Sequence, residues 1–259
     1  MLFGTPPLCL TSITQKARLL RKHGASQVVC MPFTTELAAK QPREFLRSFL
    51  AGKPIITGFC VGNDWRFGRQ NAGDARMLAA WAQDHGLECR LVDQVRYQGE
   101  PVSSTRIRAE ISAGRLDNAA AMLGHPPTVS GIVRHGNGIG ATKLNCPTAN
   151  ICEPEQQLPP YGVYAATAEW EGRSAMGIVY VGEAPTIRNQ GAPTVITELH
   201  LFDVNEELYG KEMCVAFHRF IRPSIRFNSP DELQRQIALD IQRVKDFFKT
   251  LGDFPLKSD

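Results

Sequence analysis

Apolar and polar residues follow two different patterns along the chain. In the first half, short apolar runs predict strands, and longer runs of helical period predict helices. The strands are expected at Gln27 to Met31, Ile55 to Val61 and Leu87 to Val95, and the helices at Ser12 to Gly24, Pro42 to Leu50, Gly73 to His85, Ser103 to about Ala113 and Leu116 to Leu123. Strands that alternate with helices predict a mostly parallel sheet covered by helices.

After Gly124 the pattern changes, because strand signals follow one another without long helices between them. They lie at Val129 to His135, Gly162 to Trp170, Ala175 to Val181, Thr194 to Phe202 and Met213 to Ile221. Such a succession predicts a small antiparallel sheet that is closed or nearly closed into a barrel. We therefore expect an α/β domain over residues 1–124 and a β-barrel domain over residues 125–259.

The last helix has the clearest boundaries of any predicted element. Ser229 is expected as its N-cap, Pro230 as its first residue and Glu232 as the partner in a capping box. Its apolar positions form one stripe: Leu233, Ile237, Ile241, Val244, Phe248 and Leu251. We expect this stripe to pack across the barrel.

Composition narrows the classes of function. A formal net charge of +3 over 259 residues, without a run of basic side chains, does not favour nucleic-acid binding and suits a protein that handles anionic ligands. The seven cysteines are never spaced C-x-x-C, which argues against a disulfide framework or a zinc site and favours a reducing cytoplasm. No apolar run approaches the roughly 18 residues of a membrane helix, so we expect no membrane span. The amino terminus lacks a charged region followed by an apolar core, so we expect no signal peptide.

The stretch from Gly131 to Asn150 carries the clearest chemical signal. It contains Gly136, Gly138, Gly140 and Lys143, and it ends in Cys146-Pro147-Thr148-Ala149-Asn150. Glycines let backbone N–H groups approach a polyphosphate, and the oxygens of Thr148 and Asn150 suit a Mg²⁺ ion held mainly by phosphates and water. A simple Gly-rich hairpin followed by a turn is the alternative. A Walker loop is not indicated, because no G-K-[ST] opens a helix.

Two polar stretches in the first half follow strand ends, where open α/β sheets bind ligands. They are Gly62-Asn63-Asp64-Trp65-Arg66-Phe67-Gly68-Arg69 and Ser103-Ser104-Thr105-Arg106-Ile107-Arg108. Hydroxyls at a helix start, with Arg106 and Arg108 nearby, are the elements of an anion site. On the motifs alone, an ordinary N-cap with solvated arginines and a surface ion-pair loop are the preferred interpretations.

The predicted strand from Thr194 to Phe202 places Ile196, Glu198, His200 and Phe202 on one face. A carboxylate between apolar neighbours is suited to accept a proton from a substrate alcohol, as in a kinase that phosphorylates a hydroxyl. The pattern alone leaves open that Glu198 lies on the solvated face of an edge strand.

A series of motifs resembles the riboflavin kinase module. They are Gly131-x-Val133-x-His135-Gly136 through Pro147-Thr148-Ala149-Asn150, Gly162-Val163-Tyr164, Gly182-x-x-Pro185-Thr186, Glu198-Leu199-His200-Leu201-Phe202-Asp203, Leu208-Tyr209-Gly210, Phe220-Ile221-Arg222-Pro223 and the last helix. The two polar stretches of the first half resemble the adenylyltransferase module of bifunctional riboflavin kinase/FMN adenylyltransferases, also called FAD synthetases. The resemblance covers nearly the whole chain, and the motifs occur in family order.

The resemblance implies a Rossmann-like nucleotidyltransferase domain followed by a riboflavin kinase barrel. It implies that Thr148 and Asn150 contact Mg²⁺ and the phosphates of ATP, and that the loop from Gly136 to Gly140 cradles the nucleotide. It makes Glu198 the base that activates the ribityl 5′-hydroxyl, and it places Arg222 near the flavin. ATP is then the co-substrate, riboflavin the substrate and FMN the product.

The chain departs from the family pattern in both modules. Family members usually show an arginine where Ile139 stands, a glycine where Asn145 stands and a glutamate where Ser224 stands. The adenylyltransferase module normally begins with a strand and a His-x-Gly-His segment, which this sequence lacks. The segment from Ser103 to Arg108 would then hold phosphates with little catalysis. We expect either a degenerate module or a sequence that starts at an internal Met, with roughly one leading βα unit missing.

The leading hypothesis is an ATP-dependent riboflavin kinase with an impaired adenylyltransferase half. The alternatives are a fully bifunctional FAD synthetase and a non-catalytic flavin-binding protein. The expected partners are small molecules, with neither nucleic acid nor membrane, and the sequence leaves the oligomeric state open.

Overall fold

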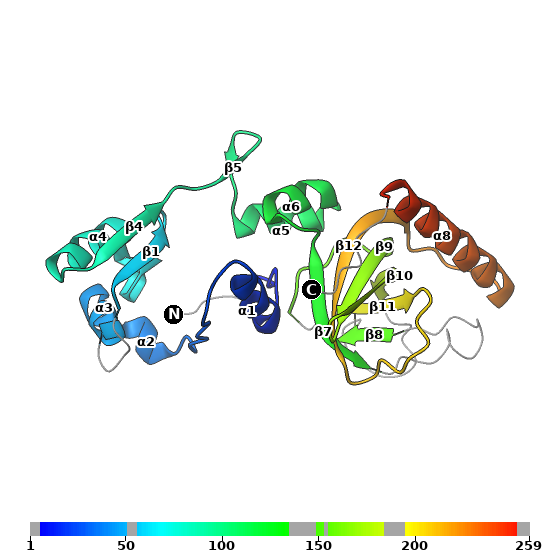
Figure 1. The fold of residues 1–259 in the computed structure, drawn as a ribbon. Coiled ribbons are helices and arrows are strands. Elements are labelled where there is room, and N and C mark those ends of the chain that lie inside the picture. The colour runs from blue at the N-terminus through cyan, green and yellow to red at the C-terminus, as the bar shows by residue number, and fades with distance from the viewer. Residues whose placement is uncertain (1–5, 51–55, 135–148, 153–154, 184–194, 253–259) are drawn as a thin grey trace. The chain divides into compact units, whose positions relative to one another are not determined.

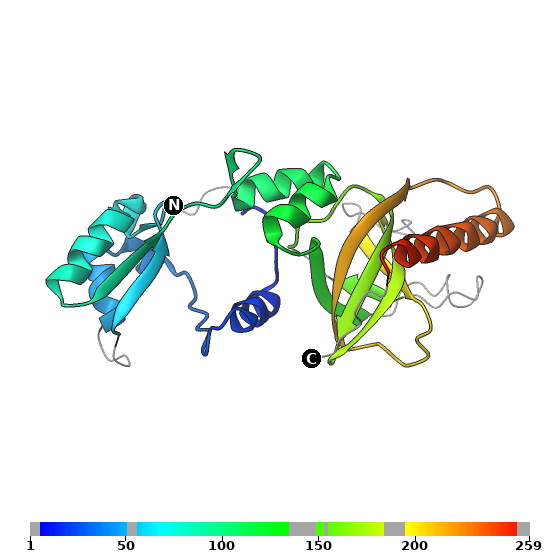
Figure 2. The same ribbon diagram turned by 45° about the horizontal axis from the view of Figure 1, so that its top comes forward.

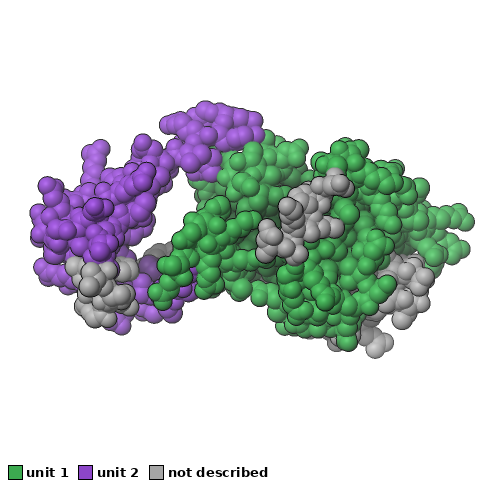
Figure 3. All heavy atoms as spheres, viewed as in Figure 1, with its two compact units in different colours: residues 1–27, 103–259 green, residues 28–102 purple. Residues whose placement is uncertain are grey.

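The computed structural model describes residues 6–50, 56–134, 149–152, 155–183 and 195–252 (Figures 1 and 2). The chain forms two compact units, one of residues 1–27 and 103–259 and the other of residues 28–102 (Figure 3). Each unit has its own hydrophobic core. The larger unit therefore includes residues from before and after the smaller one, and the expected domain boundary at residue 124 stays a prediction.

Six antiparallel strands of the larger unit close into a barrel in the order β10-β11-β8-β7-β12-β9 (Figure 1). They are β7 (Thr128–Arg134), β8 (Ala149–Cys152), β9 (Gly162–Trp170), β10 (Arg173–Glu183), β11 (Val195–Leu201) and β12 (Glu212–Pro223). Val133, Val179, Leu199 and Val215 lie in its core and are at most 1% exposed. The predicted antiparallel barrel is confirmed. Strand β8 was not predicted, because its four residues are at the lower limit of length at which a period of two can be recognised.

One helix covers part of the outer face of the barrel. This helix, α8 (Pro230–Thr250), is capped by Ser229 as expected. Val244 and Phe248 are buried in a cluster with side chains of β9, β10 and β12. Figure 2 shows the helix next to these strands. The expected packing of the apolar stripe is confirmed at these two positions, whereas Leu251, which follows the helix end, is 49% exposed.

The residues that precede the smaller unit are bound to the barrel. Gln15 of α1 (Ile13–Lys22) is 8% exposed, donates from Nε2 to Thr128 Oγ1 and accepts from Ser130 Oγ at 3.3 Å. Cys9 forms an isolated bridge with the segment that follows β8. A buried amide with both of its ends hydrogen-bonded fixes α1 against β7. Two further helices, α5 (Ser104–Ser112) and α6 (Leu116–Leu123), pack against each other.

The smaller unit holds a short parallel sheet with helices. Its elements are α2 (Thr35–Ala39), α3 (Pro42–Leu50), β1 (Gly58–Gly62), β2 (Arg66–Phe67), the 3₁₀ helix η1 (Arg69–Asn71), β3 (Gly73–Asp74), α4 (Ala75–Asp84), β4 (Glu88–Val92), β5 (Arg96–Tyr97) and β6 (Glu100–Pro101). Strands β1 and β4 pair in parallel, as expected for the α/β half. Its core contains Leu46, Phe67, Leu78 and Trp81.

The strand predicted at Gln27 to Met31 is wrong, because this segment pairs with no strand among the described residues. Val29 is 74% exposed and Met31 is 51% exposed. A strand depends on hydrogen bonds to a neighbour, and in the part of the chain described here β1 pairs with β4 alone. Apolar residues of high strand propensity are therefore not sufficient to form a strand at this place.

A buried ion pair joins α8 to the barrel. Arg222 Nε on β12 lies 2.7 Å from Asp240 Oδ2 on α8, and the two side chains are 13% and 1% exposed. Asp240 Oδ1 also accepts a hydrogen bond from Gln236 Nε2 at 2.8 Å. Both carboxylate oxygens are thus satisfied, which a buried charge requires.

We expect Asp240→Ala to lower the free energy of unfolding by about 3–5 kcal/mol, because the Arg222 guanidinium would lose its counter-charge in a buried position. Asp246→Ala is a matched control on the same helix. Asp246 also accepts from a glutamine four residues earlier, Gln242, at 2.9 Å, but its side chain is 57% exposed. Its removal is expected to change stability by no more than about 0.5 kcal/mol. Urea denaturation measures both values, and equal losses would contradict the role of the buried pair.

His218 on β12 generates a pH dependence. Its Nε2 lies 2.8 Å from Thr167 Oγ1, and burial lowers the pKa of the imidazole to about 4. An unfolded histidine titrates near pH 6.5, so between about pH 6.5 and 4 the unfolded chain binds the additional proton. The contribution of His218 to stability is therefore present above pH 6.5 and lost as the pH falls toward 4.

We expect the stability difference between wild type and His218→Gln to shift in favour of the variant when the pH is lowered from 7 to 5. Urea denaturation of both proteins at the two pH values measures this shift. A difference that does not depend on pH would contradict the buried neutral imidazole.

Candidate functional site

Glu198 and Asn150 lie directly opposite each other on neighbouring strands. Strand β11 pairs with β8 in a register that places Glu198 against Asn150. Thr197 and Leu199, on either side of Glu198, are at most 1% exposed. Glu198 and Asn150 therefore point to the outer face of the barrel. An edge strand, the alternative left open for Glu198, is wrong, because β11 lies between β10 and β8.

The same row of residues continues on both sides. Arg134 of β7 lies opposite Asn150, and Tyr180 of β10 lies opposite Glu198. Directly opposed residues in antiparallel strands have Cβ atoms about 4.5–5.5 Å apart. We call Arg134, Asn150, Glu198 and Tyr180 the polar row. Arg134 and Tyr180 were not predicted from the sequence, because alternation along one strand does not give the register between strands.

The chemistry of the polar row fits a phosphate-bound cation. Asn150 and Glu198 carry oxygens of the kind that Mg²⁺ takes as ligands, and the guanidinium of Arg134 suits a phosphate. Among the described residues, no group of three or more His, Cys, Asp or Glu side chains gathers as a metal site. A cation at the polar row would therefore take most of its ligands from phosphate and water.

The predicted glycine loop lies outside the described residues. This applies to Gly136, Gly138, Gly140, Lys143 and Thr148, and to the departures Ile139 and Asn145. Strand β7 ends at Arg134 and β8 begins at Ala149, and these strands are paired. Arg134 and Ala149, the described residues on either side of it, therefore lie on adjacent strands.

The turn that precedes β12 is hydrogen-bonded to the end of β7. The N–H of Val133 donates to the carbonyl of Lys211 at 3.0 Å, and the N–H of Gly210 donates to the carbonyl of Val133 at 2.9 Å. Gly210 has a φ of 80°, which glycine adopts without steric cost. The motif Leu208-Tyr209-Gly210 thus positions the end of β7.

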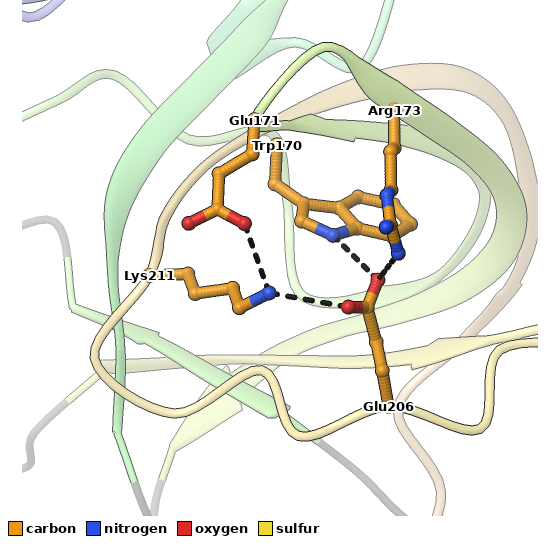
Figure 4. Close-up of polar contacts among 5 residues, drawn as sticks. All are labelled: Trp170, Glu171, Arg173, Glu206 and Lys211. Atoms are coloured by element: carbon orange, nitrogen blue, oxygen red, sulfur yellow. Dashed lines mark hydrogen bonds and ion pairs between the residues drawn. The ribbon is translucent and has the colours of Figure 1, made fainter.

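Lys211 also belongs to an ionic cluster (Figure 4). Glu206 accepts hydrogen bonds from Lys211 Nζ at 3.2 Å, Trp170 Nε1 at 2.9 Å and Arg173 Nη1 at 3.0 Å, and Lys211 also donates to Glu171 at 2.9 Å. The hydrogen bond from Lys211 is the main cause that lowers the pKa of Glu206, and Glu171 and Glu206 raise the pKa of Lys211. The cluster ties the β11–β12 connection to the β9–β10 hairpin.

Arg222, which the resemblance places near the flavin, is engaged in the ion pair with Asp240. Its Nη1 also donates to the carbonyl of Pro223 at 3.0 Å. Arg222 lies opposite Val163 of β9, which in turn lies opposite Tyr180. Along these paired residues, Val163 thus lies between Arg222 and Tyr180 of the polar row.

The hydroxyl-rich segment in the first half forms the start of α5. Ser103 Oγ accepts a hydrogen bond from the N–H of Arg106 at 3.2 Å, as an N-cap does. Ser104 and Thr105 follow as exposed residues. Arg108 Nε donates to the carbonyl of Leu8 at 2.7 Å. The N-cap is observed, and a phosphate site at these residues stays a prediction.

The loop from Gly62 to Arg69 carries side-chain contacts of the surface type. Gln94 Nε2 donates to Asp64 Oδ2 at 2.7 Å, and Arg66 lies 3.8 Å from Asp74. Both side chains of the second pair are more than 40% exposed, so the pair contributes little to stability.

No helix in the described part of the chain has the length and apolar content needed to cross a membrane.

Two protein families match different parts of the chain. The riboflavin kinase family matches residues 123–248, and the FAD synthetase family matches residues 2–106. The chain is 34% identical to the bifunctional riboflavin kinase/FMN adenylyltransferase of Escherichia coli strain K12, over 95% of this chain and 79% of the relative. It is 32% identical to the protein of the same name from Listeria monocytogenes, over 94% of this chain and 76% of the relative.

A solved structure shares the fold. The crystal structure named as a macrolide-efflux protein from Streptococcus pneumoniae superposes with a TM-score of 0.75 at 25% identity, over 95% of this chain and 79% of that one. Together with the family matches, this likeness confirms the expected fold class. The riboflavin kinase family match and the relatives confirm the expected enzyme class, an ATP-dependent riboflavin kinase. The chain belongs to the bifunctional riboflavin kinase/FMN adenylyltransferase family, with a FAD synthetase domain followed by a riboflavin kinase domain.

Proposed function

We propose that the chain transfers the γ-phosphate of ATP to the 5′-hydroxyl of riboflavin and so forms FMN. The observation that carries this proposal is the position of Glu198 opposite Asn150 on the outer face of a riboflavin kinase barrel. A carboxylate next to an amide oxygen provides a base and a cation ligand at adjacent positions. Riboflavin and ATP are the partners in this proposal.

In the proposed reaction, Glu198 accepts the proton of the ribityl 5′-hydroxyl as its oxygen attacks the γ-phosphorus. The bond between the γ-phosphorus and the β–γ bridging oxygen breaks, and ADP leaves. Backbone N–H groups of Gly136 to Gly140, together with Lys143, hold the nucleotide. Asn150 and Thr148 would hold Mg²⁺, which when bound neutralises phosphate charge. The register of β8 and β11 keeps Asn150 and Glu198 in place, so catalysis depends mainly on placement.

We further propose that the FAD synthetase half, residues 1–124, binds phosphates through Ser103, Ser104, Thr105, Arg106 and Arg108 without efficient nucleotidyl transfer. The use of the Ser103 hydroxyl as an N-cap and the contact of Arg108 with a backbone carbonyl support this proposal. Residues 125–259 form the kinase domain in this view. The names of the relatives favour a fully bifunctional enzyme as the second candidate.

Incubation with riboflavin, ATP and Mg²⁺, followed by chromatographic separation of the flavins, tests these proposals. FMN without FAD is the expected result. FAD together with FMN would show an active first half. Riboflavin binding measured by calorimetry, without formation of FMN, would favour a flavin-binding protein, for which the departures at Ile139, Asn145 and Ser224 give a reason.

Glu198→Gln is expected to lower kcat by about 10²–10⁴-fold, because the amide cannot accept the proton. Glu212→Gln is the matched control, since Glu212 is an exposed glutamate on β12 of the same barrel. Steady-state kinetics and circular dichroism separate a lost base from a lost fold. A kcat near that of wild type would remove Glu198 from the role of base.

Asn150→Ala is expected to lower turnover by one or more orders of magnitude and to raise the Mg²⁺ concentration needed for half-maximal rate, because the cation would lose an oxygen ligand. Asn150→Asp keeps an oxygen at the same position and is expected to retain more activity. Initial rates at a series of Mg²⁺ concentrations measure both effects. An unchanged Mg²⁺ requirement in Asn150→Ala would argue against this residue as a ligand.

A further inference from the structure

Tyr180 has no role in the reaction proposed above, although it lies opposite Glu198. Its hydroxyl oxygen is 3.0 Å from Ser224 Oγ, which follows the end of β12. The side chain of Tyr180 is partly exposed. A hydrogen bond therefore links the residue next to Glu198 to a segment that lies two strands away in the barrel order.

Gly182 provides the space that the Tyr180 ring occupies. A Cβ atom at Gly182 would lie 2.1 Å from the Tyr180 hydroxyl oxygen and 2.3 Å from its Cζ. Residues two apart on a strand share one face, so the ring leans along β10 over position 182. The orientation of the ring is thus set at two places, over Gly182 and at Ser224.

We propose that Tyr180 is a substrate-positioning residue for riboflavin. Its ring lies at one end of the polar row. The planar flavin packs against the face of this ring, so that the ribityl 5′-hydroxyl reaches Glu198. A tyrosine ring offers an apolar face to another aromatic ring and a polar tip that needs a partner. Ser224 is that partner. This inference rests on the proposed kinase function.

Two substitutions that each remove one hydroxyl oxygen test the proposal. Tyr180→Phe and Ser224→Ala each delete the hydrogen bond and keep the remaining side chain. Each is expected to raise the KM for riboflavin about three- to tenfold, as loss of one hydrogen bond does, with kcat and the KM for ATP changed less than about twofold. The double variant is expected to equal the single variants, because both remove the same contact.

Two further variants give matched comparisons. Gly182→Ala would displace the ring without changing either hydroxyl, and it is expected to raise the KM for riboflavin in the same direction. Tyr161→Phe is the control, since Tyr161 is a tyrosine of the same unit that is 43% exposed. Thermal unfolding of each variant shows whether the fold is kept. An unchanged KM for riboflavin in both Tyr180→Phe and Ser224→Ala, or an additive double variant, would overturn the proposal.

A second measurement separates this proposal from the kinase proposal. The Kd for riboflavin is measured without ATP, from the quenching of flavin fluorescence on binding. If wild type forms FMN and Tyr180→Phe leaves both KM and Kd for riboflavin unchanged, the positioning role alone fails. If wild type forms no FMN, the kinase proposal fails, and the Kd values of wild type and Tyr180→Phe then decide the role of Tyr180. A Kd raised about three- to tenfold supports it, and an equal Kd overturns it.

Discussion

Every strand of the barrel is hydrogen-bonded on both sides, and this closure decides where the polar row lies. Along β11, Thr197 and Leu199 fill the interior, so Glu198 must point outward. A shift of register by one residue would bury the carboxylate and expose Leu199, which is costly on both counts. The placement of the candidate base therefore follows from the packing of the core. Substrate contacts are not needed to put Glu198 beside Asn150.

The outer face of the barrel changes from buried to exposed along a single register row. The row begins with Arg222, whose side chain is 13% exposed, and Val163, which is 4% exposed as a residue. Both lie on strands that α8 contacts. It continues through the partly exposed Tyr180, Glu198 and Asn150 to the exposed Arg134. Helix α8 thus contributes to the site indirectly. It covers the buried side from which the polar row extends toward solvent.

The sequence indicated those features that depend on local pattern. The alternation of apolar and polar residues predicted most of the barrel strands. The N-cap at Ser229 and the apolar stripe predicted α8. Glu198 and Asn150 were found as separate motifs, but their juxtaposition depends on the pairing of β8 with β11. Tyr180 was missed for the same reason, because no local property marks the residue across the strand from a base. The strand at Gln27 to Met31 failed in the opposite way, since its local pattern was strong and its neighbour strand was missing from the described residues.

The bonds between α1 and the barrel have a consequence for how this protein can be divided. Residues 2–106 match the FAD synthetase family, yet Gln15 within that range is buried against Thr128 and Ser130 of the kinase barrel. The smaller unit is thus inserted between two stretches of the larger one. The boundaries of the family match and those of the compact units therefore fall at different residues. Any single cut between residues 15 and 128 would separate Gln15 from its hydrogen-bond partners on β7.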